Sequence, residues 1–294
     1  MGMGMATATA DAAVIIPHYN DVTRLRRCLA SLMDNDRTGV EILVVDNNST
    51  VPLDDVKAVF KDVRFVVEPE KGAAAARNRG VRETTAPLLF FIDADCVAAP
   101  DWLLTAHRVA SLADLVGGRV DVFDETPGSR SGAEAFETIF AFHNKDYVER
   151  KNFSVTANLL TTRATFDVVG GFINGVSEDS EWCQRAVAKG YSIAYTDDLV
   201  VSHPTRSDWE ALKRKWYRMT AESFSIEGQT GQWNLKWGLR AMAMPVSALV
   251  HLPKVLFSSK LNGATEKIRA TTTLFRLRLQ RMIWMLRQTF GQSI

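Results

Sequence analysis

The sequence predicts an α/β protein with a mostly parallel, doubly wound sheet, and two observations lead to this fold class. Up to about Asp95, short apolar runs of strand length alternate with stretches whose apolar residues recur at helical spacing. Each apolar run stops at polar residues, as expected where a buried parallel strand ends at the edge that binds ligands. No G-x-G-x-x-G pattern follows the first run, which argues against a dinucleotide cofactor.

The first half of the chain contains four strand-like runs, at residues 13–16, 41–45, 64–67 and 88–92. Helical stretches at residues 25–32, at 53–60 and from about Gly72 onward separate them. Because parallel strands place their carboxyl ends along one edge, we expect three polar groups to meet there. These groups are Tyr19-Asn20, Asp46-Asn47 and the pair Asp93 and Asp95.

The second half has a mixed pattern and no internal repeat. We expect helices at 102–112, 133–147, 179–189, 208–225 and 265–290. Strands are expected at 115–123, 155–161 and 193–195, with a further extended stretch at 199–202. A loop at 126–132 and the pair Gly170-Gly171 separate some of these elements.

Charge is distributed unevenly along the chain of 294 residues, whose formal net charge is only +1. Residues 205–294 carry 15 Lys and Arg against 5 Asp and Glu, together with five of the seven Trp. Such a basic region indicates an anionic partner: a membrane surface, a phospholipid-like substrate or nucleic acid. A hydrophobic content of 46% is ordinary for a globular protein.

Cysteine usage and the N-terminus indicate a cytoplasmic setting. Cys28, Cys96 and Cys183 are widely spaced and fit neither a disulfide framework nor a zinc site. Residues 1–12 contain no basic residue and no apolar run, so we expect a disordered leader and not a signal peptide. The best membrane-span candidate, residues 238–257, is interrupted by charged residues and prolines, and we expect no spanning helix.

Asp93 and Asp95 directly follow the apolar run 88–92. Buried carboxylates are costly unless they hold a cation or a hydrogen-bonding ligand, so this pair indicates a binding site. The alternative is two solvated residues in a turn.

Two further segments could complete a nucleotide site. Small residues at 72–76 begin a helix that carries Arg77 and Arg79, which could complement phosphate; the alternative is an amphipathic helix with solvated arginines. Asp46 could accept a hydrogen bond from a base imide, and Tyr19 offers a stacking face. The alternative for Asp46 is a strand-end turn.

A second acidic cluster, residues 177–181, begins the expected helix at 179–189. Part of its charge complements the helix dipole, but Glu178 and Asp179 exceed what capping requires. A carboxylate beside an acceptor hydroxyl could act as general base. His203 follows the extended stretch 199–202, and an imidazole there could complete a carboxylate metal site.

These pieces, in this order, resemble the family-two glycosyltransferases of the GT-A fold. The resemblance covers about residues 12–205 and rests on seven motifs. They are V-I-I-P-H-Y-N, I-L-V-V-D-N-N-S-T, G-A-A-A-A-R-N-R-G, F-I-D-A-D, T-A-N-L-L-T-T-R, V-G-G-F and S-E-D-S-E-W-C-Q-R. It implies a GT-A catalytic domain at 13–205 and leaves a basic, aromatic-rich helical extension at 206–294.

The resemblance also implies a role for each matching residue. Pro17, Tyr19 and Asp46 would hold the base, most often uracil, and Arg77 and Asn78 would face ribose and diphosphate. Asp93 would contact ribose, donor sugar or metal, Asp95 would ligate Mn²⁺ or Mg²⁺, and His203 would be a further metal or diphosphate ligand. Asn158 and Gly170-Gly171 would line the donor-sugar and acceptor cleft. Asp179 would be the catalytic base, with Glu178 orienting it or the acceptor.

The implied activity is metal-dependent, inverting transfer of a sugar from a nucleotide-sugar, most often a UDP-sugar, to a glycan acceptor in bacterial surface polysaccharide synthesis. Two departures from the family pattern bear on the site: Cys96 stands where many members have a third acidic residue, and Thr161-Thr162-Arg163 replaces a double-basic pair. One alternative is a catalytically silent scaffold or glycan-binding subunit. Another is a nucleotidyltransferase, for which a Gly-rich loop with Lys should follow the first strand, where Pro17-His18-Tyr19-Asn20 stands instead.

The basic extension suggests attachment at the inner face of the cell membrane. In residues 271–290 one helical face carries Phe275, Leu279, Met282, Ile283, Leu286 and Phe290. Four arginines, at 276, 278, 281 and 287, lie outside this stripe. Such a helix can lie in a membrane interface or contact a partner, including a second copy in a homo-oligomer. The alternative is packing on its own domain with solvated arginines. A membrane surface would suit a lipid-linked glycan acceptor, and we expect no nucleic-acid partner because no such module is visible.

Overall fold

The computed structural model describes residues 10–227, 233–292 and 294 of the chain. It divides into two compact units: Met1–Asp121 with Asn144–His203, and Val122–His143 with Pro204–Ile294. Most of the predicted leader lies outside the described residues, and the first strand begins at Ala12. The second unit starts close to the predicted boundary after residue 205 but also takes in Val122–His143, which the sequence did not indicate.

The first unit is built on an eight-stranded sheet with the order β3-β2-β1-β4-β7-β6-β8-β5, which confirms the predicted fold class. The strands are β1 (Ala12–His18), β2 (Val40–Asp46), β3 (Arg64–Val67), β4 (Leu88–Phe91), β5 (Val97–Ala98), β6 (Leu115–Phe123), β7 (Leu159–Thr162) and β8 (Ile193–Pro204). The half formed by β3, β2, β1 and β4 is parallel. β7 pairs antiparallel with both β4 and β6, and β5 pairs antiparallel with β8.

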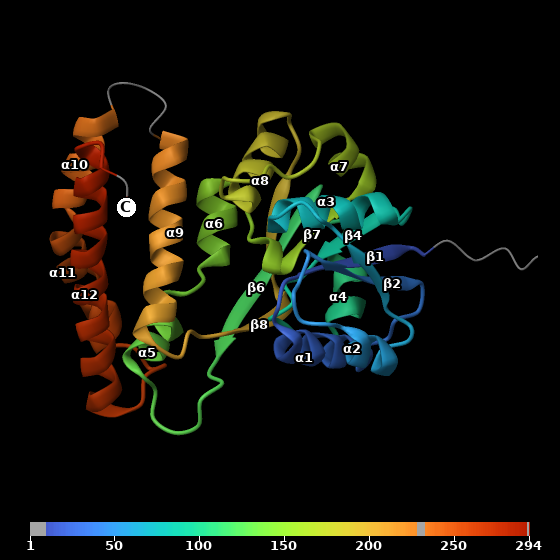
Figure 1. Cartoon of the computed structure of the whole chain (residues 1–294), viewed down its shortest axis with the longest axis horizontal. Helices are drawn as coiled ribbons and strands as arrows, with labels where there is room; N and C mark the ends of the chain where they lie inside the picture. Colours follow the sequence, from blue (N-terminus) through green and yellow to red (C-terminus); the bar gives the residue numbers. More distant parts are fainter. Residues whose placement is uncertain (1–9, 228–232, 293) are drawn as a thin grey trace, which may run out of the picture. The chain divides into compact units, whose positions relative to one another are not determined.

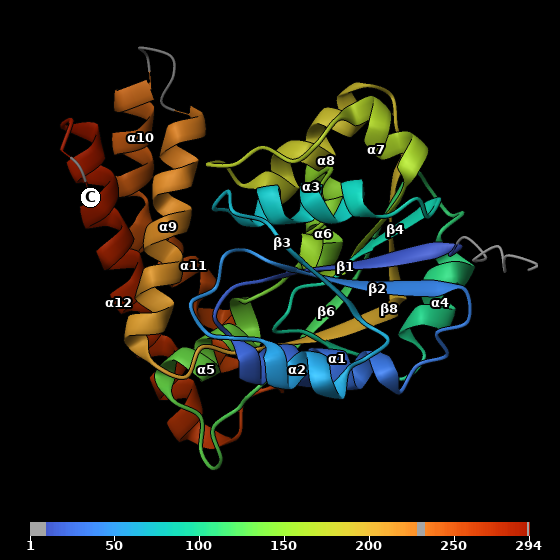
Figure 2. The ribbon, with the colours of Figure 1, turned by 45° about the vertical axis from the view of Figure 1, so that its right-hand side comes forward.

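Helices cover both faces of this sheet, with α1 and α2 on one side and α3, α7 and α8 on the other (Figures 1 and 2). The helices of the unit are α1 (Val22–Met33), α2 (Asp54–Val59), α3 (Ala73–Glu83), α4 (Trp102–Val109), α6 (Asn144–Lys151), α7 (Arg163–Val169) and α8 (Glu178–Ala188). Trp182 of α8 is fully buried and packs in a core that includes Ile15 of β1 and Phe91 of β4. This packing fixes the start of α8 against the sheet.

The strand register places the predicted polar groups at one edge. In the β1–β2 pair His18 lies opposite Asp46, and in the β2–β3 pair Asp46 lies opposite Val67. Asn47 then ties the loops together: its Nδ2 donates to the carbonyls of Glu68 and Glu70, and its Oδ1 accepts from the backbone N–H of Gly72. The start of α3 is therefore held at the edge where β1 and β2 end.

Several expected elements differ in their bounds. The single helix expected at 133–147 is two, α5 (Gly132–Phe140) and α6, and the division between the compact units falls between them, after His143. The strand expected from 155 begins as a short 3₁₀ helix, Thr156–Asn158, and β7 follows it. The two extended stretches near 193 and 199 form one strand, β8, and the short elements β5 and α7 were not expected.

The second unit is helical and consists of α5, α9 (Trp209–Glu227), α10 (Trp233–Met242), α11 (Met244–Leu256) and α12 (Gly263–Thr289). A buried carboxylate of α5 forms ion pairs with other residues of this second unit. Glu137 of α5 is 1% exposed and pairs with Arg206 at 3.2 Å and Lys215 at 2.7 Å. Burial opposes ionisation of Glu137, but the two cations hold its pKa below the usual value.

Helix α12 buries a different face from the predicted apolar stripe. Its buried residues include Leu274, Leu277, Trp284 and Met285, whereas Leu279, Ile283 and Phe290 of the predicted stripe are exposed. Arg278 and Arg281 are half-buried, so the solvated arginines of the alternative interpretation are not found at these two positions. No helix among the described residues is long and apolar enough to cross a membrane.

Candidate active site

Arg77 joins the two acidic clusters that the sequence singled out. Its Nη2 lies 2.7 Å from Oδ1 of Asp93, after β4, and its Nη1 lies 2.9 Å from Oε1 of Glu178, at the start of α8. The Arg77 side chain is 4% exposed, and the two carboxylates are 31% and 27% exposed. The structure thus brings Arg77, Asp93 and Glu178 together, although they are far apart in sequence.

Helix α3 can present Arg77 at this point because it packs closely on β1. A Cβ added at Gly80 would lie 2.5 Å from the side chain of Ile15, so only glycine permits this approach. Ala74 and Ala76 on the same helix are buried. Both terminal nitrogens of Arg77 bind carboxylates in this structure. The predicted contact of Arg77 with ribose and diphosphate stays a prediction.

Asp179 lies beside this group, in the first turn of α8. Its Oδ1 accepts hydrogen bonds from Ser177 Oγ at 3.0 Å and from the backbone N–H of Ser180 at 2.7 Å. Burial, reinforced by the negative charge of Glu178, raises the pKa of Asp179 from 3.8 to about 6. Both described hydrogen bonds fall on Oδ1, which leaves Oδ2 as the oxygen able to receive a proton.

Asp95 and His203 form a second pair, with Oδ2 of Asp95 3.2 Å from Nε2 of His203. Two adjacent ligands of an octahedral ion with bonds of about 2.1 Å would lie about 3 Å apart, so this pair fits a divalent cation. Asp93 does not join them as a third ligand, because Arg77 holds it. In the part of the chain that the structure describes, no three His, Cys, Asp or Glu side chains form a metal-binding group.

The predicted base-binding residues lie at the ends of β1 and β2. Asp46 accepts hydrogen bonds from both the backbone N–H and the hydroxyl of Ser49. The strand-end turn that was the alternative for Asp46 is therefore present, and base binding by Asp46 stays a prediction. Tyr19 is 57% exposed, which leaves its ring available for stacking. Pro17 lies opposite Val45 in the β1–β2 pair and is partly buried.

His18 is a residue of this region that the sequence analysis missed. It is 2% exposed, and neither ring nitrogen has a hydrogen-bond partner among the described residues. Burial lowers the pKa of His18, against the opposing charges of Asp46 and Asp21. The only signal in the sequence is its place between Pro17 and Tyr19 at a strand end.

Two asparagines with predicted ligand contacts form hydrogen bonds within the protein, and their ligand contacts stay predictions. Asn78 exchanges two hydrogen bonds of 2.8 Å with the backbone of Phe172. Asn158 is fully buried, where its amide accepts from Trp102 and donates to the carbonyls of Arg119 and Leu199. Both therefore act as structural clamps, Asn78 on the loop after Gly170-Gly171 and Asn158 between β6 and β8.

The two departures from the family pattern also become clear. Cys96 is buried, and burial next to Asp95 and Asp93 raises the pKa of its thiol, so it adds no charge to the site. Arg163 donates to the carbonyls of Val81, Thr84 and Ala86 and is a structural residue. Thr161 donates to the carbonyl of Asp114.

Comparison with known proteins decides the family. The model of the family "Glycosyl transferase family 2" matches residues 13–173, which is more than half of the chain. The chain belongs to this family. Membership makes it a nucleotide-sugar-dependent glycosyltransferase. Residues 13–173 contain Arg77, Asp93 and Asp95, whereas Asp179 and His203 lie beyond the matched segment.

Curated relatives include two glycosyltransferases. Glycosyltransferase AglE of Haloferax volcanii is 29% identical over 223 residues, which cover 72% of this chain and 73% of that protein. The pre-mycofactocin glycosyltransferase of Mycobacterium tuberculosis is 28% identical over 217 residues, covering 69% of this chain and 45% of the relative.

Solved structures share the fold at low identity. The mannosyltransferase PcManGT of Pyrobaculum calidifontis, in complex with GDP-Man and Mn²⁺, gives a TM-score of 0.57 at 17% identity, covering 97% of this chain and 74% of that one. S. aureus TarS 1-349 in complex with UDP gives a TM-score of 0.53 at 12% identity, covering 96% and 92%.

Proposed function

We propose that this chain is a metal-dependent, inverting glycosyltransferase that moves a sugar from a UDP-sugar to a lipid-linked glycan acceptor, with Asp179 as general base. The observation that carries the proposal is Asp179 itself. It has a raised pKa, one unused carboxylate oxygen and a place beside the group formed by Arg77, Asp93 and Glu178. A base with a pKa of about 6 is ionised at neutral pH and is still basic enough to accept a proton in the transition state.

In this mechanism Oδ2 of Asp179 removes the proton of an acceptor hydroxyl while the hydroxyl oxygen attacks the anomeric carbon. The bond to the nucleoside diphosphate breaks on the opposite face, which inverts the configuration. Ser177 and Ser180 orient the carboxylate through Oδ1. Glu178 forms an ion pair with Arg77, and the Arg77 charge limits the rise in the pKa of Asp179.

Asp95 and His203 would hold the divalent cation, whose chemistry is to stabilise negative charge on the departing diphosphate. The structural neighbours with GDP-Man and Mn²⁺ or with UDP support a nucleotide donor and a divalent metal, Mn²⁺ or Mg²⁺. The lipid-linked acceptor rests on the basic helical unit and its exposed apolar residues, described below.

Calorimetric titration with UDP, GDP and CDP, each with Mn²⁺ and with EDTA, tests the donor and metal assignments. We expect one nucleotide, UDP, to bind in Mn²⁺ and to lose at least tenfold in affinity in EDTA. Asp95→Ala should remove the Mn²⁺ dependence, because it deletes one of the two ligands. The exposed Asp62→Ala serves as control, since its carboxylate is 77% exposed and has no part in the proposed site. Unchanged Mn²⁺-dependent binding by the Asp95 variant would contradict the ligand assignment.

A folded sample that binds none of the three nucleotides would instead favour the other candidate, a silent glycosyltransferase-fold scaffold. Three observations argue against that candidate. Asp93 pairs with Arg77, Asp95 pairs with His203, and the pKa of Asp179 is raised. The nucleotidyltransferase alternative does not agree with the family assignment.

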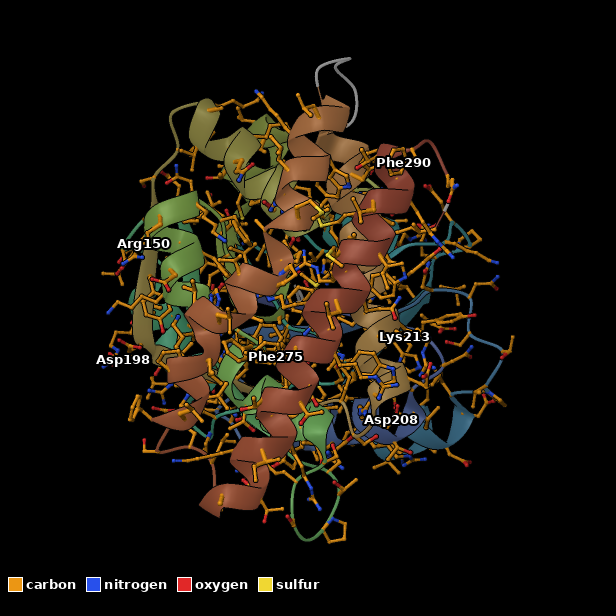
Figure 3. All side chains as sticks on the ribbon, turned by 90° about the vertical axis from the view of Figure 1, so that its left-hand side faces the viewer. Arg150, Asp198, Asp208, Lys213, Phe275 and Phe290 are labelled. Atoms are coloured by element: carbon orange, nitrogen blue, oxygen red, sulfur yellow. The ribbon has the colours of Figure 1, made fainter. Side chains whose placement is uncertain are left out.

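The second unit supports attachment to an anionic membrane surface. Helices α10, α11 and α12, with the residues that cap α11 and α12, expose twelve large apolar side chains, and Figure 3 faces these helices and labels Phe290 just after α12. The twelve are Leu235, Leu239, Met242, Val246, Leu249, Val250, Leu256, Phe257, Ile268, Leu279, Ile283 and Phe290. Exposed cations lie on the same segment: Lys236, Arg240, Lys254, Lys260, Arg269, Arg276 and Arg287.

Acidic residues are rare on this segment: Glu266 is the one acidic residue between 235 and 292, and it is buried. Exposed apolar side chains together with Lys and Arg are typical of surfaces that insert into the headgroup region of anionic bilayers. A pocket of about 340 Å³ between the end of α11 and the start of α12 adds to the apolar surface. It is lined by Leu256, Ala264, Lys267, Ile268, Thr271 and Thr272.

Flotation with vesicles tests this attachment. Phe257→Ser combined with Phe290→Ser removes the two most exposed aromatic rings, 85% and 77% exposed, and should lower binding to anionic vesicles at least tenfold. Leu104→Ser in α4, 68% exposed, is the matched control and should bind as the unmodified protein does. Equal flotation of the aromatic variant and the control would exclude these rings as anchors.

A further inference from the structure

Arg281 occupies a position in α12 that helical geometry assigns to the core. The buried residues Leu274, Leu277, Trp284 and Gln288 are spaced three, seven and four residues apart along this helix, and Arg281 falls within the gap of seven, four residues after Leu277. Arg278 precedes it by one turn. A charged residue in a buried stripe costs free energy unless something pairs with it.

Neither arginine has such a partner among the described residues. The Nε atoms of Arg278 and Arg281 are buried without a hydrogen-bond partner, and so is the indole Nε1 of Trp216 in α9. The Arg281 guanidinium carbon lies 4.6 Å from the centre of the Trp216 ring, so two of these three donors are close together. All three unsatisfied groups are N–H donors, and none is an acceptor.

The charged groups that act on Arg281 are positive, so they do not compensate its charge. Burial, together with the neighbouring charges of Arg278 and Arg240, lowers the pKa of Arg281 to about 10, with no carboxylate acting in the other direction. For Arg278, burial alone lowers the pKa. By contrast Glu137 in the same unit neutralises Arg206 and Lys215, so an unpaired buried cation is not a general feature of these helices.

We propose that α9, α10 and α12 form an anion-binding site in which Arg278, Arg281 and the Trp216 indole bind a phosphate or pyrophosphate group, with Arg240 adding positive charge. Guanidinium groups match phosphate oxygens geometrically, and a group with several acceptor oxygens can satisfy several donors at once. The ligand is either the headgroup of a phosphorylated lipid or a soluble phosphate ester. The proposal stands on the helical unit alone and does not need the assignment of Asp179.

Thermal unfolding in EDTA, at constant ionic strength, with and without pyrophosphate tests the site. We expect pyrophosphate to raise the melting temperature of the unmodified protein, because ligand binding stabilises the folded state. Arg281→Leu should unfold at a higher temperature than the unmodified protein without the anion, since it removes an uncompensated buried charge. Its affinity for pyrophosphate should be about ten- to hundredfold weaker, as for loss of a hydrogen bond to a charged group.

Arg287→Leu, which removes an exposed arginine from the same helix, is the matched control and should keep the full pyrophosphate response. No response of the unmodified protein, or equal responses of the two variants, would overturn the site. The Asp95→Ala variant tests whether pyrophosphate acts at the nucleotide-sugar site instead. We expect this variant to show the same rise in melting temperature with pyrophosphate as the unmodified protein. A weakening of binding to phosphatidate vesicles that is greater for Arg281→Leu than for Arg287→Leu would identify a lipid headgroup; a loss confined to pyrophosphate would identify a soluble ligand.

Discussion

Replacing Asp179 with Asn is expected to lower kcat by about 10²- to 10⁴-fold, the range that general-base catalysis typically contributes. Asn keeps the size of the side chain and can still accept the hydrogen bonds of Ser177 and Ser180. It cannot take a proton from the acceptor hydroxyl. Nucleotide affinity should therefore stay within about twofold of the unmodified protein, since the change removes an interaction made in the transition state.

The pH dependence of the unmodified enzyme gives a second measure of the same residue. Because Asp179 must be ionised to act and its pKa is about 6, kcat/KM should fall about tenfold per unit below that pH. Asp167→Asn, an exposed carboxylate of α7, is the control and should keep both the rate and the profile. Full activity of the Asp179 variant, or a profile flat down to pH 5, would remove Asp179 as the base.

Stability should change in the opposite direction from activity. The raised pKa means that the folded state binds the Asp179 proton more tightly than the unfolded chain does, so this group costs stability as the pH rises from about 4 through about 6. Asn cannot ionise and avoids this cost. After allowance for partial exposure, we expect the free energy of unfolding at pH 7 to rise by about 1–2 kcal/mol in the variant, measured by urea denaturation.

Replacing Arg77 with Leu should give the second large effect, a loss of about 3 kcal/mol of unfolding free energy at pH 7. The change leaves Asp93 and Glu178 without the cation that joins them. We take the lower end of the range for a broken buried ion pair because both carboxylates are about one-quarter to one-third exposed and can turn to water. Urea denaturation should show a lower midpoint with an unchanged slope.

A folded Arg77 variant should also show a changed pH dependence of kcat/KM. Arg77 lowers the pKa of Asp179, so its removal should shift the acidic limb of kcat/KM to higher pH. Arg79→Leu on the same helix is the control, because its main contact is a surface pair with Glu83 one turn away, worth at most about 1 kcal/mol. Equal effects of the two variants would show that Arg77 does not hold the acidic clusters together.

The sequence by itself determined the parallel half of the sheet and the edge where the site lies. Apolar runs ending at Tyr19, Asp46 and Asp93 fix strands whose carboxyl ends must meet once they pair in parallel, so these residues follow from local pattern and topology. The resemblance through seven motifs added the family, which the match over residues 13–173 confirms.

Only the tertiary structure decided which of the motif residues form hydrogen bonds or ion pairs with distant residues of the protein. Asn78 and Asn158 carry the motif, but their amides are bound by Phe172 and by Trp102, contacts between residues 94 and 56 positions apart. Arg77 lies 101 positions from Glu178. Periodicity reports which face of an element is apolar, but it does not report the distant atom that fills a hydrogen bond or an ion pair.

The same limit explains α12. Its sequence has apolar residues on more than one side, so the period alone could not tell that Leu274, Leu277 and Trp284 would be buried and Leu279, Ile283 and Phe290 exposed. The choice depends on α5, α9, α10 and α11, which pack against it. Burial of Arg281 on that face is a consequence of this packing, because a helix that turns one face inward carries every residue of that face with it.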